Sequence, residues 1–440
     1  MPDTSRTSSP AHWLLEQEAR ALLTRLNRVK PFALQETMVA AAAVSQGAQT
    51  AIERHLMAGR NQVRLAILDF VRWLNSPEGL TAPPALAQKK FALLRLRFIA
   101  SLTQFDIFSD ALTQRSEAET GVWLSGLDAA AADALKIAGH HYAMPPVICY
   151  LDRGHGAAIR RARTRLPGGE ENPVAVIRVP RERMIGSGVA SSLFHEVGHQ
   201  AAALLDLVES IRPVLKAKQQ SGGAETTAWQ YWERCISEIL ADFWSVARLG
   251  ITSTLGLMGV VALPSYFVFR LSLEDPHPVP WIRVKLSCAI GRGLFPHPQW
   301  DKLERLWESL YPPESLEAEK RDLLNLLEKM MPELVSLLIN HRPEKLGGLS
   351  LAAALETGQR QPARLTAYFN EWRASPNRTK RAPPSLVFAV IGQARADGVI
   401  TPEEESRSLR AMLKHWALQN VLNSSAMCVA QSAGAPHRVI

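Results

Sequence analysis

The sequence predicts an α+β fold, in which a mostly helical chain contains one small sheet near its middle. Apolar residues such as Leu65, Leu68 and Val71 recur at helical spacing, and similar patterns fill both ends of the chain. Two short β-branched runs, at 145–151 and 172–180, are bounded by proline or glycine and predict strands. Hydrophobic residues make up 47% and charged residues 21%, which is typical of a globular protein rather than a disordered one.

We expect four segments along the 440 residues. Residues 1–135, rich in Ala, Leu, Arg and Gln, predict an N-terminal helical region. Residues 136–311 contain both predicted strands and form the predicted core, and residues 312–379 are helical again. The proline-flanked stretch PNRTKRAPP near residue 380 indicates a linker, so we expect 380–440 to form a small C-terminal helical module.

Two helices are predicted inside the core segment. The first begins near Ser187, whose hydroxyl we expect to cap it, and carries the sequence GVASSLFHEVGHQAAALLDL. The second covers about 226–249, where Trp232, Ile236 and Ile239 recur at intervals of three and four. Gly222 lies in the polar loop between the two helices, which we expect to be mobile and to form the rim of a cleft.

Charge and cysteine usage restrict the class of protein. The net charge is +8, but the basic residues are spread along the chain, so no nucleic-acid binding is expected. Cys149, Cys235, Cys288 and Cys428 are far apart and form no CxxC pair, which indicates reduced thiols. The chain starts without an apolar leader, so we expect a cytoplasmic protein, with export by a leaderless route as the alternative.

The stretch 251–269, ITSTLGLMGVVALPSYFVF, carries no charge and is about long enough to cross a bilayer. It also holds Thr252, Ser253 and Pro264, and it lacks aromatic anchors at both ends. We interpret it as a buried helix followed by a turn, with membrane contact as the alternative.

The motif HEVGH carries the candidate chemistry. His195 and His199 lie four positions apart on a predicted helix, so both imidazoles project from one face and can bind a single ion. Glu196 lies beside them, where a carboxylate reaches a water molecule on the metal without being a ligand. Gly198 would allow another element to pack closely behind the second histidine.

A third ligand is predicted on the later helix. Glu238, in RCISEILADFWS, is the candidate, and Asp242 lies one helical turn further on the same face. Asp242 is expected to accept the N–H of a ligand histidine. The alternative third ligands are Glu209, Glu225 and Glu233.

HEVGH followed by E-x-x-x-D on a later helix resembles the gluzincin metallopeptidases, the thermolysin-like branch of the zincins, over roughly 174–242. The resemblance implies a zincin core of a small sheet, an active-site helix and a third-ligand helix. It implies one zinc ion held by His195, His199 and Glu238, with water in the fourth place and Glu196 as general base. It also implies that 175–179 is the edge strand along which an extended peptide binds.

Gluzincins often bring a further donor to the oxyanion of the transition state. We expect this donor to be His277, because it lies between two prolines in EDPHPVPWIRV, downstream of the ligands. Its spacing differs from that of thermolysin, so Tyr231, Tyr266 and Arg283 stay as alternatives.

The C-terminal segment ADGVITPEEES has the second half of a calcium-loop pattern but not the first, so no calcium site is expected. Thr401 and the glutamates after Pro402 indicate a helix start with a capping box. The turn resembles that of small helical domains of the tellurite-resistance type. This resemblance implies a regulatory or partner-binding module.

The sequence as a whole predicts a zinc-dependent peptidase that acts on a peptide or protein. Two alternatives stay open. One is a membrane-associated zinc peptidase in which 251–269 enters the bilayer, and the other is a non-catalytic binding or scaffold protein that zinc stabilises. The presence of Glu196, the general base, favours an enzyme over the scaffold.

Overall fold

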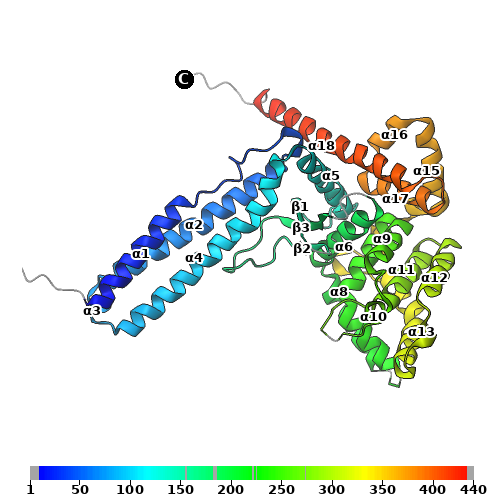
Figure 1. The fold of residues 1–440 in the computed structure, drawn as a ribbon, viewed down its shortest axis with the longest axis horizontal. Coiled ribbons are helices and arrows are strands. Elements are labelled where there is room, and N and C mark those ends of the chain that lie inside the picture. Colours follow the sequence, from blue (N-terminus) through cyan, green and yellow to red (C-terminus); the bar gives the residue numbers. More distant parts are fainter. Residues whose placement is uncertain are drawn as a thin grey trace, which may run out of the picture.

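The structure, a computed structural model, shows a mostly helical chain around one small sheet, which confirms the predicted α+β class (Figure 1). The residues that it describes are 9–153, 156–181, 186–220, 222–223, 225–272 and 274–433. The side chain of Cys428, predicted to be a reduced thiol, lies outside this description. The sheet lies between a long N-terminal helical bundle and the other helices (Figure 1).

The N-terminal bundle consists of α1 (Pro10–Arg28), α2 (Gln46–Leu74) and α4 (Pro84–Thr113), and the short α3 (Pro77–Thr81) connects α2 with α4. The bundle projects away from the remainder of the molecule (Figure 1). Each helix buries one stripe of apolar residues at intervals of three and four against the other two, as the sequence pattern requires. The final turns of α4 reach the sheet, where they share a second apolar cluster with β1 (Val147–Asp152).

The sheet has the strand order β1-β3-β2 in the described part of the chain. The strand β3 (Ala175–Pro180) pairs parallel with β1 and antiparallel with β2 (Ala158–Arg160). β1 and β3 match the two predicted strands, whereas β2 was not predicted. The expectation that 175–179 is an edge strand is wrong, because β3 is the central strand. Its β-branched residues are buried on both faces of the sheet, which suits a central position.

The two faces of the sheet contact different helices. Ile177 belongs to the main core together with Leu193 and Val197 of α6 (Ser187–Leu204). Its neighbour Val176 points to the opposite face and packs in the cluster formed with α2 and α4. This alternation follows from the two-residue repeat of a strand, and it places α6 under one face of the sheet only.

The helices α6 and α8 (Glu225–Leu249) form the centre of the main core. They approach closely at Gly198, where an added Cβ atom would lie 2.8 Å from both the Cα and the carbonyl oxygen of Ala241. Glycine is therefore required for this helix contact, as the sequence suggested. Ser187 does not cap α6 as expected. Its hydroxyl instead accepts a hydrogen bond of 2.7 Å from Nη1 of Arg395.

The uncharged stretch 251–269 folds as α9 (Ile251–Val261), a turn and the short α10 (Ser265–Val268). α9 packs on α6 through Gly256, so most of its residues are buried. After the turn, Tyr266 and Phe267 are exposed. In the part of the chain that the structure describes, none of the helices combines the length and the apolar character needed to cross a bilayer.

The remaining helices surround this centre. They are α5 (Ala118–Leu135), α7 (Leu207–Gln219), α11 (Pro280–Leu294), α12 (Gln299–Leu310), α13 (Ala318–Asn340), α14 (Leu351–Ala354), α15 (Pro362–Ala374), α16 (Pro376–Arg381), α17 (Pro384–Ala396) and α18 (Pro402–Ala433). The linker expected near residue 380 is the short helix α16. α17 and the first half of α18 contribute to the same apolar cluster as α8. Thr401 and Glu404 form the expected capping box at the start of α18.

Candidate metal centre

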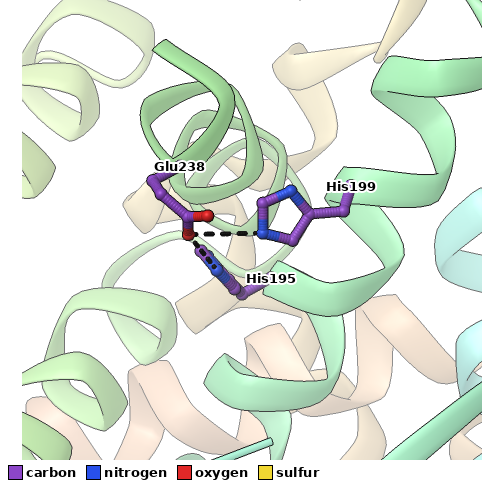
Figure 2. Close-up of side chains that lie close together, drawn as sticks. All are labelled: His195, His199 and Glu238. Carbon is purple, nitrogen blue, oxygen red and sulfur yellow. Dashed lines mark hydrogen bonds and ion pairs between the residues drawn. The ribbon is translucent and has the colours of Figure 1, made fainter. Parts of the chain in front are cut away.

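Three predicted ligand side chains meet between α6 and α8. His195 and His199 lie one turn apart on α6, and Glu238 faces them from α8 (Figure 2). Its Oε2 atom lies 3.1 Å from Nε2 of His195 and 3.3 Å from Nε2 of His199. His195 and Glu238 are buried, and His199 is half-buried. These residues form a buried group that could hold a metal ion.

The spacing of these atoms can be compared with that of a zinc site. Two ligand atoms on a tetrahedral zinc, each about 2.0–2.1 Å from the ion, lie about 3.3 Å apart. The separations from Oε2 of Glu238 to the two Nε2 atoms, 3.1 and 3.3 Å, agree with this value. Two imidazoles and one carboxylate are also a ligand set that zinc uses with water. The residues present therefore fit zinc.

The ion pair of buried Asp242 and half-buried Arg283 lies behind His195 and fixes its ring. Oδ1 of Asp242 lies 2.8 Å from Nδ1 of His195, as expected for a residue that orients a ligand histidine. Arg283, from α11, donates to both carboxylate oxygens of Asp242, with Nε 2.7 Å from Oδ2 and Nη2 2.8 Å from Oδ1. When Nδ1 of His195 donates to Asp242, the lone pair on Nε2 faces Glu238 and is free for a metal.

Arg283 was an alternative oxyanion donor in the sequence analysis. In the structure its guanidinium is buried and forms a two-pronged ion pair with Asp242. Tyr231, another alternative, is also engaged, because its hydroxyl accepts a hydrogen bond of 2.7 Å from the backbone N–H of Val279. This bond fixes the start of α11. Tyr266 is 74% exposed and lies outside the lining of the cavity at His195.

Glu196 lines a cavity of about 290 Å³ beside the histidines. The cavity is also lined by His195, His277 and, from the segment just before β2, Gly156 and Ala157. Glu196 is 7% exposed, and it makes no hydrogen bond or ion pair with any other described residue. Its carboxylate is thus available to a molecule in the cavity.

His277 reaches the same place from the loop before α11. Its Nε2 atom lies 3.0 Å from Oε2 of Glu238, and its Nδ1 atom lies 2.7 Å from Oδ1 of Asp275. Three imidazoles therefore surround one carboxylate oxygen. Asp275 was not identified from the sequence, although its position two residues before His277 in EDPHPVP was a signal for such a contact.

The electrostatics follow from these contacts. Burial by itself raises the pKa of Glu238, but hydrogen bonds from His195, His199 and His277 outweigh it and hold this pKa far below its usual range. Burial also opposes the charge on His195, yet the carboxylate of Asp242 raises its pKa to about 9. The pKa of Asp242 is lowered despite its burial, since Arg283 and His195 favour the charged form. The centre thus keeps its two carboxylates ionised.

The alternative third ligands lie elsewhere. Glu233 pairs with Arg212 at 2.7 Å, Glu225 lies 3.7 Å from Lys329, and Glu209 is exposed on α7. None of these three glutamates belongs to the His195 group.

A second group of carboxylates also meets the distance criterion for a metal. Glu304 and Glu308 of α12 and Glu328 of α13 lie close together, but Lys285 of α11 is placed among them. Its Nζ atom lies 2.5 Å from Oε1 of Glu308 and 3.5 Å from Oε1 of Glu304, and it also contacts Glu328. The Lys285 side chain is only 1% exposed. This group therefore contains its own cation.

Comparison with known protein families, with curated proteins and with solved structures finds no match for this chain. The potential metal site therefore stands on the arrangement of His195, His199 and Glu238 alone.

Proposed function

We propose that this protein is a zinc-dependent peptidase. The observation that carries the proposal is the convergence of His195, His199 and Glu238 around one point, with Glu196 lining the adjoining cavity. A non-ligand glutamate next to two ligand histidines on one helix is the arrangement that metal-assisted hydrolysis uses. This supports a catalytic site over a purely structural one.

Each side chain has a role in the proposal. Zinc, held by His195, His199 and Glu238, would polarise a substrate carbonyl and increase the acidity of water. Glu196 accepts the proton of the attacking water on a carboxylate oxygen and then delivers it to the leaving amine. His277 donates from Nε2 to the carbonyl oxygen as negative charge develops on it. Asp275, 2.7 Å from Nδ1, orients the His277 ring for this donation.

The edge of the sheet supports a peptide as substrate. Gly156 and Ala157 line the cavity, and the chain continues directly into β2, which lies at the edge of the described sheet. An edge strand offers unpaired backbone groups to which an extended peptide can add as a further strand. β2 thus takes the role that the resemblance had implied for 175–179.

The cellular location is part of the proposal. Cys149, Cys235 and Cys288 are buried and unpaired, which supports a reducing compartment and hence the cytoplasm. The burial of most of α9 favours its interpretation as a core helix over a peptidase that inserts 251–269 into a bilayer.

The test compares wild type with Glu196→Gln, Glu238→Ala and Glu209→Gln. Each protein is analysed for zinc and then incubated with a diverse peptide library that is read by mass spectrometry. We expect Glu196→Gln to retain zinc while cleavage falls by about 10²–10⁴-fold, the usual contribution of a general base. Glu209→Gln removes an exposed acid from the neighbouring helix and should behave as wild type.

His277→Ala separates two roles for that histidine. Retained zinc with slower cleavage is expected for an oxyanion donor, whereas loss of zinc would make His277 a ligand. A wild-type protein that holds zinc but cleaves no peptide would contradict the peptidase and favour the zinc-stabilised scaffold. Equal cleavage by wild type and Glu196→Gln would contradict the proposed mechanism.

A further inference from the structure

A second cavity lies on the face of the sheet that is turned away from α6. Its volume is about 520 Å³. Its lining includes three arginines and three other polar residues, namely Arg160, Arg161, Arg178, Tyr150, Thr164 and Asp110. Five of these six side chains can donate hydrogen bonds to an anion, whereas the carboxylate of Asp110 cannot.

The register of the sheet explains why these side chains meet. Arg178 of β3 pairs with Tyr150 of β1 on one side and with Ala158 of β2 on the other. Arg160 pairs with Val176, two residues before Arg178, and therefore projects from the same face. That face is the one on which Val176 packs against the cluster of α2 and α4. The two arginines are thus placed side by side by strand pairing rather than by flexible loops.

The positive charge of the cavity is only partly compensated. The Nη1 atom of Arg178 lies 3.7 Å from Oδ2 of Asp152, but its buried Nε atom has no hydrogen-bond partner in the described part of the chain. Among the described residues, neither Arg160 nor Arg161 forms an ion pair. Guanidinium groups in such a cluster match the planar carboxylate group and can bind it through two hydrogen bonds.

The strand β2 connects this cavity with the metal centre. Gly156 and Ala157 line the metal cavity, and the next three residues, Ala158 to Arg160, line the arginine cavity. At about 3.3 Å per residue, Arg160 lies roughly 13 Å along the strand from Gly156. A peptide paired with the outer edge of β2 would present alternate side chains to the two faces of the sheet. One set would face α6, and the other would face the arginines.

We propose that the cavity of Arg160, Arg161 and Arg178 is a subsite for an acidic side chain of the substrate. The acidic residue would lie about three or four positions from the bond that is cut, given the rise of an extended chain. That the ligand is a substrate rests on the proposed peptidase function. The preference of the cavity for an acidic side chain is independent of that function, because binding can be measured without cleavage.

The experiment uses the full-length, zinc-loaded Glu196→Gln protein, so that peptides bind without being cut. The probes are fluorescein-labelled dodecapeptide pools of mixed neutral residues, each with one glutamate, one glutamine or one lysine at a fixed position. Binding is measured by fluorescence anisotropy. We expect the best glutamate pool to bind about tenfold more tightly than its glutamine counterpart, as for a charge-assisted contact. Adding Arg160→Glu and Arg161→Glu should abolish the preference and favour a lysine pool instead.

The control is Arg305→Glu, which reverses an exposed charge on α12 and should leave the preference unchanged. Thermal unfolding of each variant verifies that it is folded.

Equal binding of the glutamate and glutamine pools, absence of binding, or a preference that survives the double variant would each overturn the subsite. Inorganic phosphate that binds as tightly as the glutamate pool would make the cavity a small-anion site and would also overturn it. Cleavage without an acidic preference would overturn the subsite alone, whereas an acidic preference without cleavage would overturn only the peptidase.

Discussion

Among the residues that the structure describes, two groups of side chains have the spacing of metal ligands, and they differ in how their negative charge is balanced. In the first, His195, His199 and Glu238 converge, and none of the described lysines or arginines forms an ion pair with Glu238. In the second, Glu304, Glu308 and Glu328 surround the buried amine of Lys285. The spacing of the ligand atoms is therefore insufficient to distinguish a metal centre from an internal salt-bridge cluster.

The positions of the basic residues make the distinction. Lys285 points into its carboxylates, so the chain itself supplies the cation that a metal would otherwise provide. Arg283, two residues earlier on the same helix, instead points at Asp242 and leaves Glu238 to the histidines. Helix α11 therefore orients the histidine group through Arg283 and neutralises the glutamate group through Lys285. Substitutions in and around the two groups, and a change of pH, test this contrast.

Replacement of the buried lysine should have the largest effect. Lys285→Met removes the amine that contacts all three carboxylates. Glu304 keeps its contact with Arg292, but among the described residues Glu308 and Glu328 keep no cation. We therefore expect the free energy of unfolding to fall by about 3–5 kcal/mol. Calcium chloride should restore part of the stability of this variant but not change wild type, because a divalent ion can replace the amine. Urea unfolding measures both effects. Lys302→Met, at an exposed position of α12, is the control. A loss no greater than that of the control would show that the cluster does not depend on Lys285.

Loss of the charge behind His195 should weaken zinc binding without removing a ligand. Asp242→Asn keeps the shape of the side chain but replaces the carboxylate that accepts from Nδ1 of His195. We expect zinc affinity to fall by about 10–100-fold, the usual effect of such a partner. Competition with a chromophoric chelator measures it. Unchanged affinity would mean that the Asp242 carboxylate has no influence on the ligand.

The close contact between the two ligand-bearing helices should tolerate no added methyl group. Gly198→Ala places a Cβ atom 2.8 Å from the backbone of Ala241, so we expect about 1–3 kcal/mol of destabilisation and weaker zinc binding. Gly259→Ala in α9, where an added Cβ meets nothing within 4 Å, should be neutral or stabilising. Chemical denaturation compares the pair. Equal effects of the two substitutions would refute the role of this glycine.

Zinc affinity should depend on pH in a definite direction. The pKa of His195 is raised to about 9, so the imidazole carries a proton below that pH and zinc must displace it. Each pH unit below 9 should therefore weaken zinc binding by about tenfold for this one proton. Measurement at several pH values between 7 and 9 gives the slope. A flat profile over this range would contradict the raised pKa. Asp242→Asn should lower the pH at which affinity levels off.

The elements of the fold could be predicted where a pattern of neighbouring residues in the sequence indicates them. Helical spacing identified α6 and α8 nearly to their ends, and β-branched runs identified β1 and β3. β2 was missed because three residues, Ala-Ile-Arg, carry no alternating pattern. The edge position that the resemblance implied for 175–179 was wrong, because the unrecognised β2 pairs with the outer side of β3. The helical linker α16 shows that proline-rich stretches can also begin short helices.

In the candidate site, too, the residues that share one helix could be predicted from the sequence. The histidines and Glu196 share one helix, and Glu238 and Asp242 share another, so helical geometry alone orients each set. Arg283 and Lys285 were different, because their carboxylate partners come from other helices at large sequence separations. No pattern in the sequence links Arg283 with Asp242. Such ion pairs depend on how the helices pack, which a single sequence does not specify.

We propose that the first group holds zinc and that the second does not. The most direct test loads purified wild type, Glu238→Ala and Glu328→Gln with zinc, removes weakly bound ions by dialysis, and counts zinc by elemental analysis. We predict about one zinc per chain in wild type and in Glu328→Gln, and none in Glu238→Ala. A wild-type chain without zinc, or zinc retained by Glu238→Ala and lost by Glu328→Gln, would contradict the account.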